Sequence, residues 1–156
     1  MQHWPWGIAA MQPTEPLNPN FKGDISASFA KLVLMRTIGA KLVRVEPGEV
    51  DVALPFRDDL TQQLGYIAAG VVSAILDVAC GYAAMSLAPP RTTILTVEFK
   101  LNLLAPALGE RFVARGHVIR PGRTITVCGG DVVALNATEE ELIATMLATM
   151  MTIKEG

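Results

Sequence analysis

The chain has 156 residues, of which 51% are hydrophobic and 18% charged, and its formal net charge is −2. This length fits one domain with a substantial core. The Lys and Arg residues are scattered, which argues against a nucleic-acid partner. Every apolar run of about 18 residues is interrupted by a charge or a helix breaker, so no membrane span is predicted. The excess of apolar residues indicates that a partner subunit covers part of the surface.

Residues 1–23 are rich in Pro, Asn and Gln, and we expect them to form an N-terminal arm, loose or wrapped over a neighbour. Trp4 and Trp6 favour docking of this arm. Residues 24–156 are expected to form a single domain. The start of the chain has no basic segment followed by an apolar one, so it is unlike a secretory signal, and a reducing, cytoplasmic setting is expected.

The cysteines and histidines give no sign of a metal site or a cofactor. Cys80 and Cys128 could pair only if the fold brought them together, and free, buried thiols are the preferred interpretation. His3 and His117 are far apart in the sequence, and neither has a second type of metal ligand at a useful spacing. We therefore predict neither metal nor cofactor.

The first predicted element is a short amphipathic helix, with Asp24 or Ser26 as its N-cap and Gly39 at its end. Two β-rich runs over 40–54 then flank the Pro-Gly turn at 46–49, which is typical of a hairpin.

A long apolar helix follows a polar loop and ends before Pro89. Between Gly70 and Leu87, Asp77 is the only charged residue, and an apolar surround of this kind predicts a helix that is buried on all sides. An unpaired buried carboxylate is costly, so Asp77 must be paired, protonated or used for chemistry as a base or nucleophile. A purely structural role, such as bonding to nearby backbone or facing a dimer seam, is the alternative.

Strand patterns fill the rest of the chain, over 92–104, 111–120, 123–135 and 142–153. Gly129-Gly130 predicts a bulge in the third of these strands. The last run also contains good helix formers, so a helix is its alternative. One long helix is then available to cover one face of an antiparallel sheet of about six strands, which would curl around it. The predicted fold class is α+β.

Three stretches in this order resemble the PaaI-like acyl-CoA thioesterases of the hotdog-fold superfamily: LTQQLGYIAAGVVSAILDVACGYAAMSL, TVEFKLNLLAPA and VIRPGRTITV. The resemblance covers residues 39–153. It implies a hotdog fold, in which a curved sheet wraps a long central helix. It also implies a homodimer, or a tetramer made of two dimers, with active sites at the dimer interface.

The resemblance implies a role for each catalytic residue. Asp77 would attack the thioester carbonyl or activate a water, and Thr96 would help to hold that water. The backbone N–H of Gly70 or Ala69 would polarise the thioester oxygen, and Gln62 would supply an amide side chain.

The resemblance also assigns residues to substrate binding. Gln63 lies next to Gln62, and Arg123 matches a basic residue near the CoA phosphates, with a solvated turn as its alternative. Tyr66 could line an acyl tunnel or pack in the core. Gly81 would leave a notch beside the carboxylate, or serve close packing of the helix on the sheet.

Two features of the helix start qualify these roles. Gly70 and Asp77 are seven residues apart, roughly 10 Å along a helix, which is too far to act on one carbonyl within one subunit. Pairing the helix start of one subunit with the acid of the other removes this difficulty. The similar enzymes commonly have His-Gly-Gly or His-Ala-Gly where this chain has Ala68-Ala69-Gly70.

The leading hypothesis is hydrolysis of an acyl-CoA, with a medium-to-long or aromatic acyl group, to a free acid and CoA. A non-catalytic protein that binds acyl-CoA or CoA is the main alternative, because Ala68 replaces the usual His. A hydratase or dehydratase would pair a His with an acid, and neither histidine is near the helix in sequence. An assembly protein with an inactive site is the last alternative.

Overall fold

The computed structural model describes residues 15–154, so the expectations for Trp4 and Trp6 lie outside the described residues, and the division into arm and domain stays a prediction. The elements in chain order are α1 (Phe21–Lys31), α2 (Val33–Ile38), β1 (Lys41–Glu46), β2 (Glu49–Pro55), a 3₁₀ turn (Asp58–Leu60), α3 (Ala69–Leu87), β3 (Thr92–Leu103), β4 (Arg111–Arg120), β5 (Ile125–Leu135) and β6 (Glu140–Lys154).

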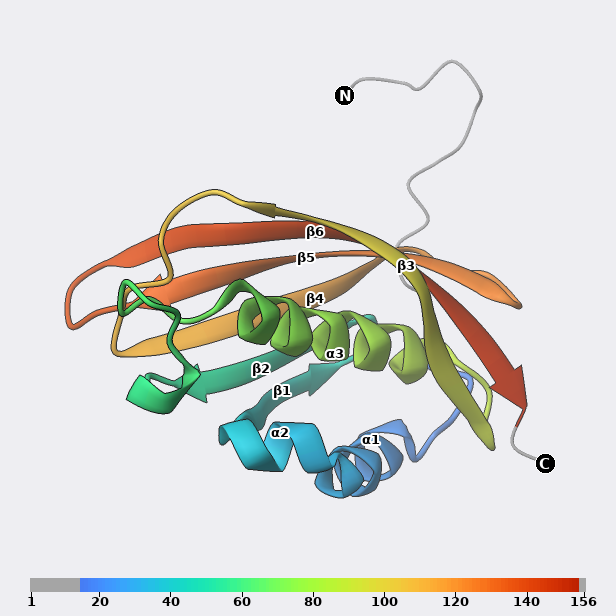
Figure 1. Cartoon of the computed structure of the whole chain (residues 1–156). Coiled ribbons are helices and arrows are strands. Elements are labelled where there is room, and N and C mark those ends of the chain that lie inside the picture. Colours follow the sequence, from blue (N-terminus) through green and yellow to red (C-terminus); the bar gives the residue numbers. More distant parts are fainter. Residues whose placement is uncertain (1–14, 155–156) are drawn as a thin grey trace, which may run out of the picture.

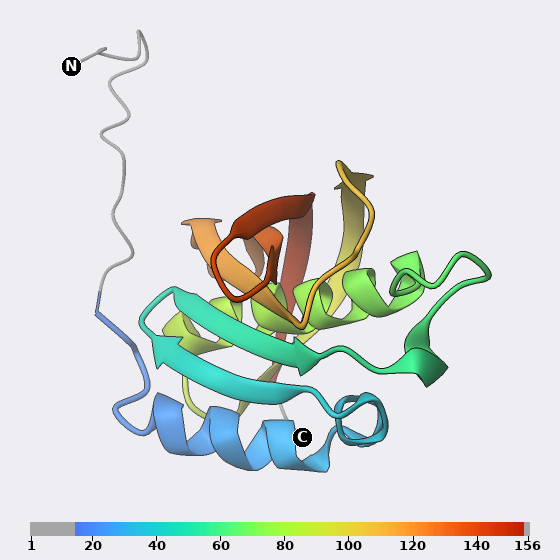
Figure 2. The ribbon, with the colours of Figure 1, turned by 90° about the vertical axis from the view of Figure 1, so that its left-hand side faces the viewer.

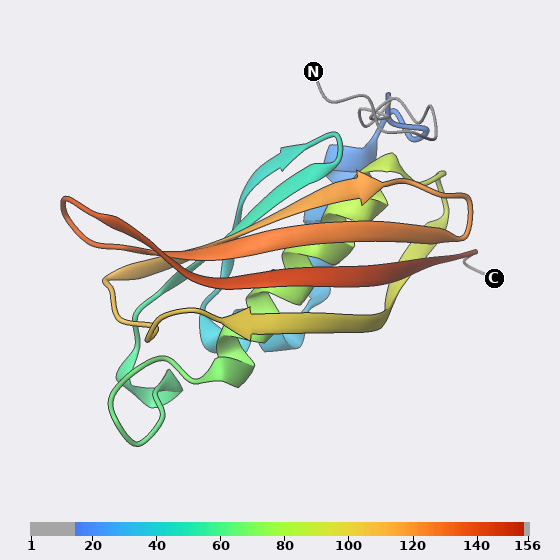
Figure 3. The same cartoon turned by 90° about the horizontal axis from the view of Figure 1, so that it is seen from above.

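The strands form one antiparallel sheet of six strands in the order β1-β2-β4-β5-β6-β3. The sheet curves around α3 without closing into a barrel, and β1 and β3 form its two edges (Figures 1 and 3). The predicted α+β fold, with one long helix wrapped by about six antiparallel strands, is confirmed. The final run of the chain is a strand, as preferred from the sequence.

The side of α3 that faces the sheet is fully buried and includes Ile75, Leu76, Ala79 and Cys80. By length and composition alone this helix could cross a membrane, but about half of it is buried inside the protein, and this burial accounts for its apolar sequence. Cys80 and Cys128 are both buried and free, and burial raises the pKa of both thiols.

The prediction that α3 is buried on all sides is wrong for the single chain. The sheet covers one side of the helix, and α1 packs alongside it away from the centre of the sheet (Figure 2). Between α1 and the edge strand β3, a strip of α3 that contains Asp77, Val78 and Gly81 stays partly exposed. The exposed strip arises because an edge strand has no neighbour to extend the sheet over the helix.

The N-terminal helical segment differs from the sequence prediction in two ways. Helix α1 begins at Phe21 with Asn20 as its N-cap, so neither Asp24 nor Ser26 caps it. The Asp24 carboxylate instead accepts hydrogen bonds from the side chains of Asn18 and Asn20, at 2.7 and 2.9 Å. The segment also breaks at Leu32, which has an extended ψ of 99°, before α2 continues to the predicted end at Gly39.

The predicted bulge at Gly129-Gly130 is also wrong, because both glycines pair regularly with β4 and β6. The irregularity of this strand pair lies on β4, between Val118 and Arg120. Gly130 is instead needed for space: a Cβ on it would lie 2.7 Å from Leu76 Cδ1 of α3 and 2.8 Å from the backbone oxygen of Arg115. A glycine in a strand often marks such a close approach rather than a bulge.

The tightest contact between helix and sheet is at Gly116 of β4. A Cβ at this position would overlap the backbone carbonyl group of Ala79 and lie 2.5 Å from the nitrogen of Cys80. Real Cβ atoms essentially never approach other atoms so closely. Gly116 therefore sets how deeply α3 sits in the curve of the sheet.

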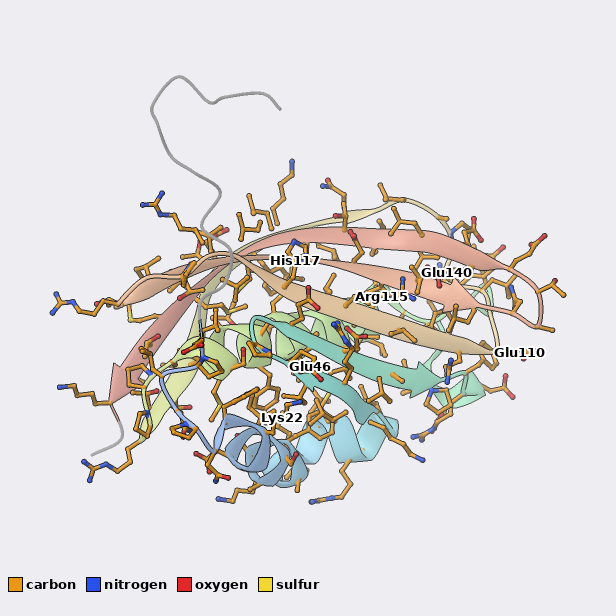
Figure 4. All side chains as sticks on the ribbon, turned by 180° about the vertical axis from the view of Figure 1, so that it is seen from behind. Lys22, Glu46, Glu110, Arg115, His117 and Glu140 are labelled. Carbon is orange, nitrogen blue, oxygen red and sulfur yellow. The ribbon has the colours of Figure 1, made fainter. Side chains whose placement is uncertain are left out.

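The outer face of the sheet carries charged side chains such as Arg115 and Glu140 (Figure 4), beside apolar ones such as Val113 and Val133. Arg115 donates two hydrogen bonds to Glu140, at 2.7 and 2.9 Å, and Lys22 of α1 pairs with Glu46 of β1 at 3.0 Å. Exposed pairs of this kind contribute at most about 1 kcal/mol each. His117 follows Gly116 on β4, so it points to this outer face, away from α3.

The contrast between two glycines gives a test of this packing. We expect Gly116→Ala to lower the free energy of unfolding by about 1–3 kcal/mol, because α3 would have to move outward. Gly81→Ala is the matched control: it lies inside α3 with open space where the new methyl group would lie, so it should raise stability by about 0.5–1 kcal/mol. Urea unfolding of both variants measures these changes, and equal effects would contradict the described contact.

Candidate active site

The half-buried carboxyl group of Asp77 faces the edge strand β3. The hydroxyl of Thr96 donates a hydrogen bond to Asp77 Oδ1 at 2.7 Å, and it also lies 3.5 Å from the sulfur of Met150. The register between β3 and β6 shifts between Thr96 and Glu98, so the edge strand carries a bulge next to this contact. Bulges often redirect a side chain beside a functional site.

The surroundings of Asp77 change the acidity of its carboxyl group. Burial raises the pKa of its carboxyl group, and the hydrogen bond from Thr96 offsets part of this rise. Among the residues from 15 to 154, no Lys, Arg or His forms an ion pair with Asp77. A carboxylate that is desolvated and unpaired by a cation holds a proton more readily than an exposed one.

A cavity of about 180 Å³ opens beside Asp77 and Thr96 and includes Gly81. A Cβ built on Gly81 would meet no atom within 4 Å. Of the two roles considered for Gly81, the structure therefore supports the notch beside the carboxylate. Close packing between helix and sheet belongs to Gly116 instead.

The start of α3 presents free backbone donors. Ala68, the N-cap, has no capping side chain, and its carbonyl accepts bonds from the N–H groups of Val71 and Val72 at 2.9 and 3.2 Å. Within the described part of the chain, the N–H groups of Ala69 and Gly70 have no such acceptor. The first turn contains no acidic residue, so the positive end of the helix dipole is not neutralised there.

A second hollow, of about 160 Å³, lies at this helix start and is lined in part by Gln62, Tyr66 and Ala69. The Gln62 side chain accepts a hydrogen bond from the backbone N–H of Leu64, which holds it in the loop before α3. Gln63 is exposed and lines neither this hollow nor the cavity at Asp77.

Arg123 lies in the turn between β4 and β5, where it is exposed. It lines neither of the two hollows. The structure therefore does not bring it to the other predicted site residues within one chain.

The predicted site residues thus fall into two groups on one chain. Asp77, Gly81 and Thr96 line the cavity at the middle of α3, whereas Gln62, Tyr66 and Ala69 lie at its start with Gly70. Seven residues of helix separate Gly70 from Asp77, about 10 Å along the axis. Neither group alone presents both an acid and a free N–H pair to one carbonyl.

The sequence interpretation missed part of the cavity wall at Asp77, namely Ser28, Leu32, Tyr82 and Met85. Met85 could have been found, because it follows Asp77 and Gly81 at intervals of four residues on one helix face. Ser28 and Leu32 come from the N-terminal helical segment, and no sequence pattern links them to α3.

The edge strand β3 is unusually apolar for an exposed edge. Leu95, Val97, Phe99 and Leu103 are 53%, 52%, 42% and 53% exposed. Within residues 15–154, β3 pairs with β6 only. A long apolar edge of this kind is a template for pairing with another strand.

Comparison with known proteins places this geometry in context. The family described as Thioesterase superfamily matches residues 64–141. A thioesterase family protein from Silicibacter pomeroyi, whose structure is solved, is 46% identical to this chain in sequence. The two structures align with a TM-score of 0.84 over 86% of this chain and 98% of the other.

Two more distant proteins are also similar, the first of them in fold. The PaaI protein from the phenylacetic acid degradation operon of E. coli is 14% identical with a TM-score of 0.79, over 89% of this chain and 97% of its own. A candidate esterase from Saccharolobus solfataricus is 27% identical over 94 residues, which are 60% of this chain and 66% of that relative.

The raised pKa of Asp77 predicts a pH-dependent cost to stability. Folding favours the protonated acid, so the carboxyl group weakens the fold as pH rises from the unfolded value near 3.8 through the raised folded pKa. We expect Asp77→Asn to be more stable than the parent at pH 7, with the difference shrinking as pH falls through this window. Urea unfolding of both proteins between about pH 3.5 and 7.5 measures this difference in the free energy of unfolding, of which about 1 kcal/mol can be resolved. A difference that does not change with pH would contradict the assigned burial.

Proposed function

The chain belongs to the thioesterase superfamily, and on this premise we propose that it hydrolyses an acyl-CoA to a free acid and CoA at a site shared by two subunits of a homodimer. The observation that carries the proposal is the Asp77–Thr96 pair: a half-buried acid, without a cationic partner in the described chain, held by a hydroxyl at 2.7 Å.

The proposed reaction uses the two groups of residues for separate tasks. Thr96 occupies Oδ1 of Asp77, which leaves Oδ2 to accept a proton from a water. That water attacks the thioester carbonyl, and the N–H of Gly70 or Ala69 stabilises the negative oxygen that forms. The C–S bond then breaks, and the CoA thiolate takes up a proton. Direct attack by the Asp77 carboxylate is the other route that the same geometry permits.

The shape of the chain favours a dimer through β3. The start of β3 carries Thr96 beside the acid, and its end at Leu103 lines the hollow at the helix start. If two copies pair their β3 strands antiparallel about a two-fold axis, the Thr96 end of one meets the Leu103 end of the other. This arrangement would bring Asp77 of each subunit towards the helix start of its partner. Two such dimers could form the tetramer.

One feature supports a second function, the binding of acyl-CoA or CoA without turnover. Ala68 supplies no polar side chain at the N-cap, so at this position only backbone groups can bond to a ligand at the helix start. Binding of CoA by calorimetry, without release of thiol from any thioester, would support this alternative. The contact of Arg123 with CoA phosphates stays a prediction for both functions.

The role of Asp77 is tested by release of free thiol from a panel of acyl-CoA substrates. We expect Asp77→Ala to lower kcat/KM by about 100-fold or more, the usual effect of a general base. A variant that hydrolyses thioesters as fast as the parent would contradict the proposed chemistry.

Thr96→Val should have a smaller effect with a distinct signature. Because the Thr96 hydroxyl lowers the pKa of Asp77, its loss should move the acidic limb of the pH–rate profile to higher pH. Thr93→Val is a matched control, since Thr93 lines the same cavity and makes no hydrogen bond with Asp77. An unchanged pH profile in Thr96→Val would show that the hydroxyl does not act through Asp77.

The shared site is tested by mixing two inactive variants. Asp77→Ala removes the acid, and Gly70→Pro removes a backbone N–H where the first turn of a helix tolerates proline. A dimer with one chain of each kind keeps one complete site, so random mixing should restore about a quarter of the parent activity. Gly70→Ala, which keeps the N–H, is the control and should be active. Mixtures that stay inactive after subunit exchange, with both variants folded, would contradict a site built from two chains.

A further inference from the structure

The cavity at Asp77 continues along α3 beyond the residues that the proposed reaction uses. Asp77, Gly81 and Met85 follow one another on a single face of the helix, two turns or about 12 Å long. Gly81 leaves open space at the middle of this face. The cavity therefore leads from the acid towards the C-terminal half of α3.

Helix α1 closes this cavity at the side opposite β3. Ser28 of α1 and Leu32 at the end of that helix line it together with Tyr82 of α3, and the Tyr82 hydroxyl lies 3.0 Å from Ser28 Oγ in a hydrogen bond. The rings of Phe29 and Tyr82 also pack against each other, with centroids 6.1 Å apart. These contacts form an end wall made from two helices.

This wall is firmly held. Ile25 of α1 is fully buried in the core, and Phe21 is nearly so. The break between α1 and α2 falls at Leu32 itself, where an extended backbone replaces helical geometry and the side chain packs partly buried against the core. Substrate could not push α1 aside without exposing these apolar side chains to water, which is unfavourable.

The part of the cavity that one chain forms is small. Its volume is about 180 Å³, and an apolar protein cavity of about 150 Å³ accepts a benzene molecule. An acyl group of roughly six to eight carbon atoms would therefore fill it. A long fatty acyl chain would meet the Ser28–Tyr82 wall.

Resting on the proposed function, we infer that α1 is the element that selects the acyl group: Ser28 and Leu32 end the acyl pocket and restrict the enzyme to short and medium acyl chains. Both residues lie outside the segment 64–141 that matches the thioesterase superfamily. Selection of substrate is thus separated in the chain from the residues that carry out hydrolysis.

The test compares acyl-length profiles of kcat/KM, from acetyl-CoA to hexadecanoyl-CoA, for the parent and two variants of opposite effect. The parent should be fastest with hexanoyl- or octanoyl-CoA. Ser28→Leu shortens the pocket and should lower kcat/KM with octanoyl-CoA about tenfold or more relative to kcat/KM with acetyl-CoA. Leu32→Ala enlarges the pocket and should move the optimum towards longer chains.

Matched controls lie on α1 and α2 but outside the cavity. Ser26→Leu and Val33→Ala change exposed residues by similar chemistry and should keep the parent profile. Thermal melting followed by circular dichroism shows that each variant is folded. If Ser28→Leu does not fold, because Tyr82 loses its hydrogen-bond partner, Leu32→Ala alone decides.

The outcomes separate this inference from the proposed function. An active parent that prefers hexadecanoyl-CoA, or variants that keep the parent profile, would overturn the role of α1 and leave the thioesterase proposal intact. A folded parent that hydrolyses no acyl-CoA of any length would overturn the proposed function, and the inference with it.

Discussion

The contact between α3 and the sheet at Gly116 is the constraint on which the site depends. Because no side-chain atom separates the helix from β4 at this point, α3 lies deep in the curve of the sheet. At that depth Asp77, at the middle of α3, is within hydrogen-bond distance of the edge strand, and the start of the helix opens beside the loop before it. A larger residue at this one position would displace both ends of the site together.

The depth of α3 in the sheet also leaves its surface with one fully buried side and one partly exposed strip. The sheet covers the side that contains Ile75 and Ala79, so hydrophobic burial holds the helix, while the strip between α1 and β3 is free to carry chemistry. Asp77 is tolerated in an otherwise apolar helix because it lies on this strip, where Thr96 provides a hydrogen bond. The cost of placing a carboxylate next to the core is also what raises its pKa.

The sequence was most informative where its patterns have a local physical cause. The period-2 alternation in 111–120 and the Pro-Gly turn at 46–49 predicted strands and a hairpin that the structure has, because both depend on neighbouring residues alone. The break at Leu32 and the true reason for Gly130 depend on contacts between distant segments, which composition does not record.

The candidate site shows the same difference between features with a local cause and contacts between distant segments. The isolation of Asp77 in an apolar helix marked it as special from the sequence. Thr96 was named only through resemblance to known enzymes, as a residue that would help to hold the water, and its hydrogen bond to Asp77 was not predicted. The end wall of the cavity was not reached at all, since Ser28 and Tyr82 are 54 residues apart. Pairings of this kind exist only once the sheet has set the position of α3 and α1 has packed against it.

The two buried cysteines have a practical consequence for enzymology. A thiol reacts with aromatic disulfide reagents as its thiolate. Burial keeps the thiols of Cys80 and Cys128 away from solvent and protonated, and it raises the pKa of Cys128 to about 12. In an assay of the proposed hydrolysis, a colorimetric thiol reagent present throughout would thus react with any CoA released and leave the folded protein unmodified. Turnover can be followed continuously, and any slow reaction of the protein itself would report the rate at which its core opens.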